Sequence, residues 1–113
     1  MAFAPDGLSP LGGYPRSDDK GREMQASLDP MTLMNDFFAA VEVMMEDPAS
    51  TGKVGFVGFC YGGGVVNATA VAYPGLSAAV SFYGRQPKLE DVPRMQAPIQ
   101  QHYAALDSRI TDG

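Results

Sequence analysis

The chain contains few of the residues that build disulfides, metal centres and cationic surfaces. Of its 113 residues, one is cysteine, one is histidine and none is tryptophan. A single cysteine excludes an internal disulfide and is typical of a reducing compartment, so we expect a cytoplasmic protein. Eight Lys and Arg residues stand against thirteen Asp and Glu residues, which gives a formal net charge of −5. This balance argues against nucleic acid and anionic membrane surfaces as partners.

Long hydrophobic runs are also missing. No apolar stretch approaches the roughly 20 residues that a membrane-spanning helix needs, and the N-terminus lacks the basic start and apolar segment of a signal peptide. We therefore expect no membrane association. With 113 residues, of which 45% are hydrophobic, the chain predicts one domain at most, with enough apolar material to bury a core.

Periodicity and turn residues predict alternating helices and strands. An apolar stub at 1–4, interpreted as the end of a strand, precedes a long irregular loop over 5–27 that is rich in Gly, Pro, Ser and charge. Asp29 as N-cap and Pro30 at the first position begin a helix that Asp47-Pro48 ends. The remaining predicted elements are strands at 54–59, 78–83 and 99–103, a helix over 62–73 and a polar loop over 84–96. This alternation is typical of an α/β fold with a mostly parallel sheet and right-handed crossovers.

The most informative motif is the hexapeptide G-F-C-Y-G-G at 58–63, between a predicted strand and a predicted helix. It has the form of the nucleophile elbow G-x-S-x-G, with Cys60 in the serine position. Such a turn strains the backbone of the nucleophile, and we expect Gly58 and Gly62 to leave room where strand and helix approach. The first N–H groups of the helix favour a thiolate. The Tyr61 N–H can donate to an oxyanion formed by attack at Cys60.

The motif also admits interpretations other than a nucleophile. A lone cysteine is most often a small buried hydrophobe, but glycines on both sides of a strand–turn–helix junction favour a reactive role. A dinucleotide fingerprint G-x-G-x-x-G beginning at Gly58 would need glycine in place of Cys60. A phosphate-binding P-loop would need lysine in place of Val65. Neither pattern fits.

Three functional side chains lie at or just beyond the carboxyl ends of different predicted strands: Cys60, Tyr83 and Asp107. In parallel α/β sheets these ends share one edge, where ligands bind, so we expect an active site there. Plain structural roles remain open, since Asp107 could cap a turn and Tyr83 could be a half-buried strand aromatic. His102 lies inside the third predicted strand and is expected to be satisfied by its neighbours.

The sequence resembles the dienelactone hydrolase family, a branch of the α/β-hydrolase fold. The segments that carry the resemblance are the elbow at 58–64, Phe82-Tyr83-Gly84, the stretch around Asp107 and, upstream, Ala4-Pro5-Asp6-Gly7-Leu8. The resemblance covers essentially the whole chain but only the middle of the family's domain. It implies an incomplete α/β-hydrolase, with residues 1–113 lacking the N-terminal strands and the C-terminal segment that bears the histidine.

The resemblance also implies a Cys–His–Asp triad that hydrolyses carboxylic esters, including enol lactones. Cys60 would be the nucleophile, and Asp107 would be the acid that orients the histidine. Tyr61 would supply one oxyanion donor through its N–H, and Tyr83 would line the substrate pocket. The implied partner is a small-molecule ester or lactone, and neither a cofactor nor a metal is implied.

Two features depart from the family pattern. His102 precedes the acid and does not match the triad histidine, and Gln100-Gln101 place two amides in a strand that the family usually keeps apolar. We therefore expect the chain alone to be an inactive or very poor catalyst. One alternative is a non-catalytic remnant of a decayed hydrolase gene, an interaction fragment that self-associates through exposed sheet edges. Another is that a separate polypeptide supplies the missing strands and histidine.

Overall fold

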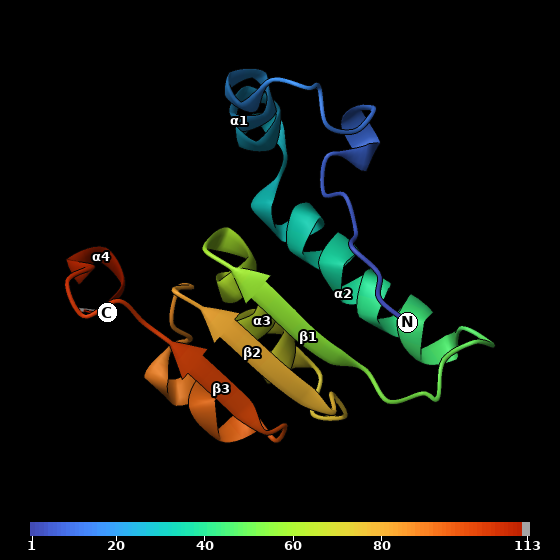
Figure 1. Cartoon of the computed structure of the whole chain (residues 1–113), viewed down its shortest axis with the longest axis vertical. Coiled ribbons are helices and arrows are strands. Elements are labelled where there is room, and N and C mark those ends of the chain that lie inside the picture. The colour runs from blue at the N-terminus through green and yellow to red at the C-terminus, as the bar shows by residue number, and fades with distance from the viewer. Residues whose placement is uncertain (112–113) are drawn as a thin grey trace. The chain divides into compact units, whose positions relative to one another are not determined.

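The chain forms two compact units, Met1–Gly52 and Lys53–Gly113. The computed structural model describes the backbone of residues 1–111 and the side chains of residues 1–109. The described elements of the first unit are helices, whereas the second unit contains the sheet (Figure 1). The predicted α/β class is confirmed.

The long helix of the first unit begins and ends at the residues that predicted it. Helix α2 spans Pro30–Glu46, with Asp29 as its N-cap. The Asp29 carboxylate accepts a hydrogen bond from the Thr32 N–H at 3.0 Å, and Pro30 fills a first-turn position whose N–H would have no intrahelical acceptor. Asp47 follows as the C-cap.

The segment predicted as an irregular loop, 5–27, is more regular than expected. It contains a short 3-10 helix, η1, at Ser9–Leu11 and an α-helix, α1, at Asp18–Ser27. The Ser17 hydroxyl caps α1 by accepting from the Lys20 N–H at 3.5 Å, and two acids in the first turn suit the helix dipole. Because α1 is polar almost throughout, hydrophobic periodicity could not reveal it. The stub at 1–4 forms no strand, since no described strand pairs with it.

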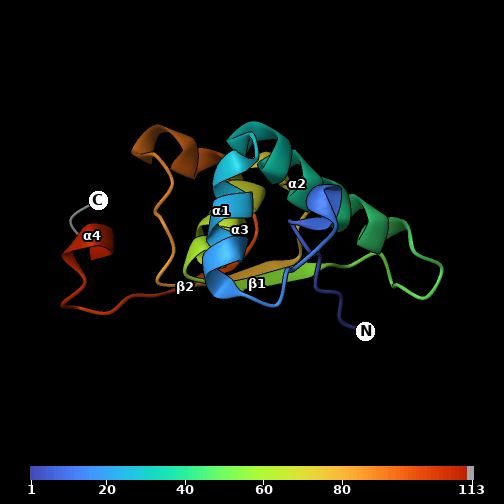
Figure 2. The same ribbon diagram turned by 90° about the horizontal axis from the view of Figure 1, so that it is seen from above.

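The second unit is a three-stranded parallel sheet in the order β1-β2-β3. The strands are β1 at Gly55–Phe59, β2 at Ala78–Phe82 and β3 at Ile99–His102, and helix α3 spans Tyr61–Ala72. These bounds agree with the predicted ones to within a residue. Helix α3 packs on β1 and β2, and Figure 2 shows it on one side of the sheet. The predicted polar loop at 84–96 contains a 3-10 helix, η2, at Leu89–Arg94, and a short helix, α4, follows at Ser108–Thr111.

The register aligns the last residues of the three strands. Phe59 lies opposite Phe82, and Phe82 lies opposite His102. Their rings stack across the sheet, with centroids 4.7 Å apart for Phe59 and Phe82 and 4.4 Å apart for Phe82 and His102. His102 is therefore a strand histidine, as predicted, and its exposed side chain stacks on a neighbouring ring.

The two faces of the sheet differ in cover. Toward α3 the strands present small or polar residues that are buried, such as Ala79 and Ser81, and the Ser81 hydroxyl donates to the Gly63 carbonyl at 3.0 Å. On the other face, Val57 and Phe59 are 56% and 57% exposed. Side chains alternate along a strand, so the small residues let α3 approach closely, and Val57 and Phe59 lie on the opposite face.

Candidate active site

Cys60 stands at the apex of a sharp turn between β1 and α3. Its backbone has φ 55° and ψ −117°, a conformation that costs a non-glycine residue on the order of 1–3 kcal/mol. The Cys60 N–H donates to the Phe82 carbonyl at 2.9 Å, and the Cys60 carbonyl accepts from the Gly63 N–H at 3.0 Å. These bonds fasten the residue to the sheet on one side and to the helix on the other. The succession of β1, this turn and α3 confirms the predicted strand–turn–helix geometry. The cysteine at its apex is exposed.

Glycine makes the turn possible, but only one of the two predicted glycines is needed for its missing side chain. A Cβ added at Gly58 would overlap the carbonyl oxygen of Gly62. A Cβ added at Gly62 would lie in open space. The expectation that both glycines leave room was therefore wrong for Gly62. That residue contributes its backbone to the contact, and Gly58 supplies the space.

A second close approach joins α3 to the turn after β2, and it was not predicted. A Cβ added at Gly63 would lie 2.7 Å from the Phe82 carbonyl oxygen, and one added at Gly84 would overlap the backbone of Gly63. Both glycines are buried. The elbow helix is thus held against the segment that follows Tyr83. The available signal was the glycine directly after the aromatic end of a predicted strand.

Tyr61 occupies the first position of α3, with Cys60 as the N-cap. The N–H of this residue lies at the helix N-terminus beside the thiol, and its role as an oxyanion donor stays a prediction. The Tyr61 side chain is 46% exposed. Partial burial raises the pKa of the Tyr61 phenol above its ordinary value, and the ring is therefore neutral near pH 7.

Tyr83 follows β2 directly and also has a left-handed backbone, with φ 39°. Its N–H donates to the His102 carbonyl at 2.6 Å, which extends the pairing of β2 with β3 beyond the strand. The Tyr83 ring lies 6.4 Å from the Phe59 ring at an interplanar angle of 51°. Tyr83 therefore lies at the same sheet edge as Cys60, with its ring beside that of Phe59.

Asp107 lies beyond the end of β3 and forms an ion pair with Arg109. Its N–H donates to the Ala104 carbonyl at 3.1 Å and closes a turn. Arg109 Nε lies 3.1 Å from Asp107 Oδ1, and a second contact of 3.4 Å joins the other guanidinium nitrogen to Oδ2. The hydrogen bond and charge of Asp107 raise the pKa of Arg109, and the charge of Cys60 acts in the same direction.

The predicted acid and nucleophile follow the carboxyl ends of β3 and β1, with β2 between them. Parallel pairing places both after the same edge of the sheet, as expected. The imidazole of His102, the last residue of β3, stacks on the ring of Phe82 at this edge. The ion pair described for Asp107 is with Arg109, whose guanidinium was not identified from the sequence. Its signal was a basic residue two positions after the acid.

A buried polar cluster behind the elbow was also missed. Asn67 on α3 is 1% exposed, and its Nδ2 donates to the Arg85 carbonyl at 2.9 Å. Its Oδ1 accepts from Gln101 Nε2 at 2.6 Å, and the Tyr103 hydroxyl donates to Gln101 Oε1 at 2.9 Å. An amide in an otherwise apolar stretch of helix was the signal. Gln101, unusual in the family pattern, is therefore paired with a buried partner.

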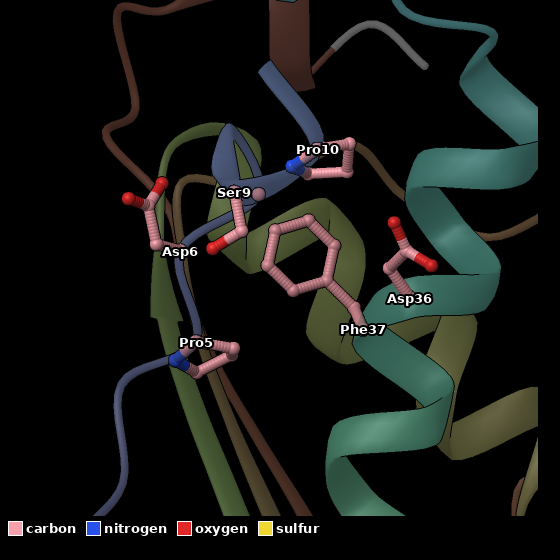
Figure 3. Close-up of a pocket in the computed structure, with 7 residues that line it drawn as sticks. Pro5, Asp6, Ser9, Pro10, Asp36 and Phe37 are labelled. Atoms are coloured by element: carbon pink, nitrogen blue, oxygen red, sulfur yellow. The ribbon is translucent and has the colours of Figure 1, made fainter. Parts of the chain in front are cut away.

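The first unit contains a cavity of about 400 Å³. The ring of Phe37 points into it, with Asp36 beside the ring (Figure 3). Its lining residues are Pro5, Asp6, Gly7, Ser9, Pro10, Asp36 and Phe37. The Asp6 carboxylate already accepts from the Leu8 N–H at 2.9 Å, in a local turn. None of the four predicted site residues lines this cavity.

The described part of the chain contains neither a metal-ligating cluster nor a membrane-spanning helix. There, no three His, Cys, Asp or Glu side chains gather into a group able to hold a metal ion. No helix among the described residues combines the length and apolar character needed to cross a bilayer.

Comparison with known families and proteins agrees with the geometry. The family model for the dienelactone hydrolase family matches residues 1–113. The chain belongs to this family. The predicted family is therefore confirmed, and three parallel strands with helices in an open sheet are consistent with part of the α/β-hydrolase fold.

Several curated relatives of this chain in the dienelactone hydrolase family are longer than the chain itself. It is 32% identical to carboxymethylenebutenolidase of Pseudomonas putida, over 87% of this chain and 45% of that protein. It is 43% identical to the carboxymethylenebutenolidase homolog of Mus musculus, over 51% of this chain and 24% of that protein. The hydrolase fragment YghX of Escherichia coli (strain K12) is 67% identical over 30 residues, 26% of each chain. The matches thus span less than half the length of each of these relatives.

Proposed function

We propose that this chain carries the nucleophile of a carboxylic ester hydrolase, with Cys60 as the attacking group. The observation that carries the proposal is an exposed thiol held at φ 55° and ψ −117° at the N-terminus of α3. A merely structural cysteine has no need of that strained conformation. Relatives named carboxymethylenebutenolidase support a small-molecule ester or lactone as substrate. In this proposal residues 1–113 form part of one hydrolase domain, and the free thiol suits the cytoplasm.

The first chemical step is acylation of the thiol. The Cys60 thiolate attacks the ester carbonyl carbon, a C–S bond forms and the carbonyl oxygen becomes an oxyanion. The Tyr61 N–H, at the first position of α3, donates to that oxyanion. Collapse of the intermediate breaks the C–O bond, and the expelled alkoxide takes a proton from water. Tyr83, 43% exposed at the same sheet edge, lines the space for the substrate.

The second step, hydrolysis of the thioacyl group, limits the chain by itself. It requires a base that activates water, and Asp107 would orient a histidine for that purpose. His102 is the one histidine of this sequence, and its ring stacks on Phe82. We therefore expect acylation to outpace deacylation and turnover to be very poor, since loss of a triad member costs several orders of magnitude in rate.

An activated aryl ester tests both parts of the proposal. With p-nitrophenyl acetate, the 113-residue chain should release up to one equivalent of p-nitrophenol and then stop, and Cys60→Ala should abolish the release. If the parent chain turns over many equivalents and Cys60→Ala abolishes this turnover, the expectation of poor catalysis is refuted. The assignment of Cys60 as the nucleophile would then still stand. A release that survives Cys60→Ala would refute Cys60 as the nucleophile.

The second candidate function is a non-catalytic interaction fragment. It is favoured by Val57 and Phe59, apolar strand residues that are each more than half exposed. An exposed apolar sheet face and open edges promote pairing with another copy. Sedimentation over a range of concentrations distinguishes this function, because association that Cys60→Ala leaves unchanged would favour it.

A further inference from the structure

Three segments meet at the side chain of one buried residue, Asn67. It lies on the elbow helix and is 1% exposed. One partner, the Arg85 carbonyl, lies 18 residues away in the sequence, and the other, Gln101 Nε2, lies 34 residues away. A buried amide is costly unless its hydrogen bonds are satisfied. The two bonds therefore hold the turn after β2 and the strand β3 at fixed positions against α3.

The polar contact continues beyond β3 through Gln101. Its Oε1 accepts from the Tyr103 hydroxyl at 2.9 Å, and Tyr103 follows β3 directly. Burial raises the pKa of the Tyr103 phenol, while a hydrogen bond with Asn67 lowers it in part. The next turn runs from Ala104 to Asp107, whose N–H closes it at 3.1 Å.

We propose that Asn67, Gln101 and Tyr103 are positioning residues that fix the acid-bearing segment, residues 104–109, relative to Cys60. The proposal rests on the proposed function in that Asp107 is taken as the acid of the site. The elbow helix that begins after Cys60 also carries the Asn67 amide, which binds Gln101 of β3 and, through Gln101, is linked to Tyr103. Displacement of this segment would change the positions of Asp107 and Arg109 relative to the thiol without changing either residue.

The adjacent residue Gln100 provides a matched control. It is the same residue type in the same strand, its side chain is exposed, and alternation along β3 directs it to the face opposite Gln101. Gln101→Leu removes the bonds to Asn67 and Tyr103. Gln100→Leu makes the same chemical change on the other face. A general effect of a leucine in β3 would appear in both variants.

Paramagnetic relaxation enhancement measures the placement directly. A nitroxide label is attached to Cys60, the one cysteine of the sequence, and relaxation of the backbone amides is measured in the ¹⁵N-labelled full chain. We expect Gln101→Leu to change the enhancement at residues 104–109 and to leave Ala78–Phe82 as in the parent. Gln100→Leu should change neither. An unchanged enhancement at 104–109 in a folded Gln101→Leu chain, or equal changes in both variants, would overturn the proposal.

A milder variant decides the matter if Gln101→Leu does not fold. Tyr103→Phe removes one hydroxyl and retains the ring, and we expect a smaller change of enhancement confined to residues 104–109. The parent pattern in Tyr103→Phe would then overturn the proposal. No ester is used in these measurements, so a failure of ester acylation and a failure of positioning give separate results.

Discussion

The two units of the chain are stabilised by hydrogen bonds of different range. In Met1–Gly52, side-chain bonds join near neighbours, as between Asp29 and Thr32, three residues apart, or between Asp6 and Leu8, two residues apart. In Lys53–Gly113, the bonds of Asn67 reach residues 18 and 34 positions away. Local signals therefore account for the first unit, whereas the second depends on contacts between distant segments.

The difference explains how the strained backbone of Cys60 is maintained. A backbone conformation such as that of Cys60 is kept only where the surrounding structure over-determines it. The described contacts that do so are the close approaches at Gly58 and Gly84 and the buried amide of Asn67. All of them lie in the unit with the sheet. Substitutions in that unit should therefore have larger effects than similar ones in the other.

The largest effect is expected for Gly58→Ala. Its Cβ would overlap the Gly62 carbonyl oxygen, so we expect the free energy of unfolding to fall by about 3 kcal/mol or more. The matched variant Gly62→Ala places its Cβ in open space and should stabilise α3 by about 0.5–1 kcal/mol. Urea unfolding followed by circular dichroism measures both. Similar losses in the two variants would show that the assignment of space to Gly58 is wrong.

The next effect concerns buried and exposed asparagines. Asn67→Ala leaves the Arg85 carbonyl and Gln101 without their buried partner, and should cost about 2–3 kcal/mol. Asn35→Ala makes the same change at an exposed position of α2 and should alter stability by less than about 0.5 kcal/mol. Urea unfolding of both chains tests the difference. Equal, small changes would contradict the importance given to the long-range bonds.

A moderate effect is expected at the cap of α2. Asp29→Ala removes the acceptor of the Thr32 N–H and should destabilise the helix by about 1 kcal/mol. Hydrogen exchange at the Thr32 amide should quicken, with little change in the amides of the sheet. Asp29→Asn keeps a capping oxygen and serves as the control. Faster exchange throughout β1–β3 would contradict the local character of the first unit.

The smallest effect is a dependence on pH. Burial raises the pKa of the Tyr103 phenol above its ordinary value of 10.0, so the folded chain holds that proton more tightly than the unfolded chain. This contribution to stability is complete below pH 10 and is lost as the pH rises through the raised value. Tyr103→Phe should therefore make the alkaline loss of stability less steep in urea titrations. A steeper loss in the variant would contradict the sign.

Sequence patterns predicted the elements whose signals are local. Caps predicted α2, and a short apolar run followed by small residues predicted β1, α3 and the elbow between them. Helix α1 was missed because its stability signals are polar rather than periodic. The sequence predicted that both Gly58 and Gly62 lack a side chain for steric reasons, but only Gly58 does. A motif shows which residues are small, but it does not show which added Cβ would collide with a neighbour.

The contacts around the site could not be predicted in the same way. The pairing of Asn67 with Gln101 depends on the register of β3 against β2 and on the placement of α3 over both. The ion pair of Asp107 with Arg109 spans only two residues, but the family resemblance predicted a histidine as the partner of Asp107. A polar residue inside an apolar element is the general signal for such partners.

The central claim is that the elbow presents Cys60 as a nucleophile, and acylation at that residue tests it most directly. The chain is treated with p-nitrophenyl acetate, quenched in acid and analysed by intact mass and peptide mapping. We predict one acetyl group per chain, located on the peptide that contains Cys60 and absent after Cys60→Ala. Acetylation found only on lysine or tyrosine side chains, with the thiol unmodified, would contradict the account.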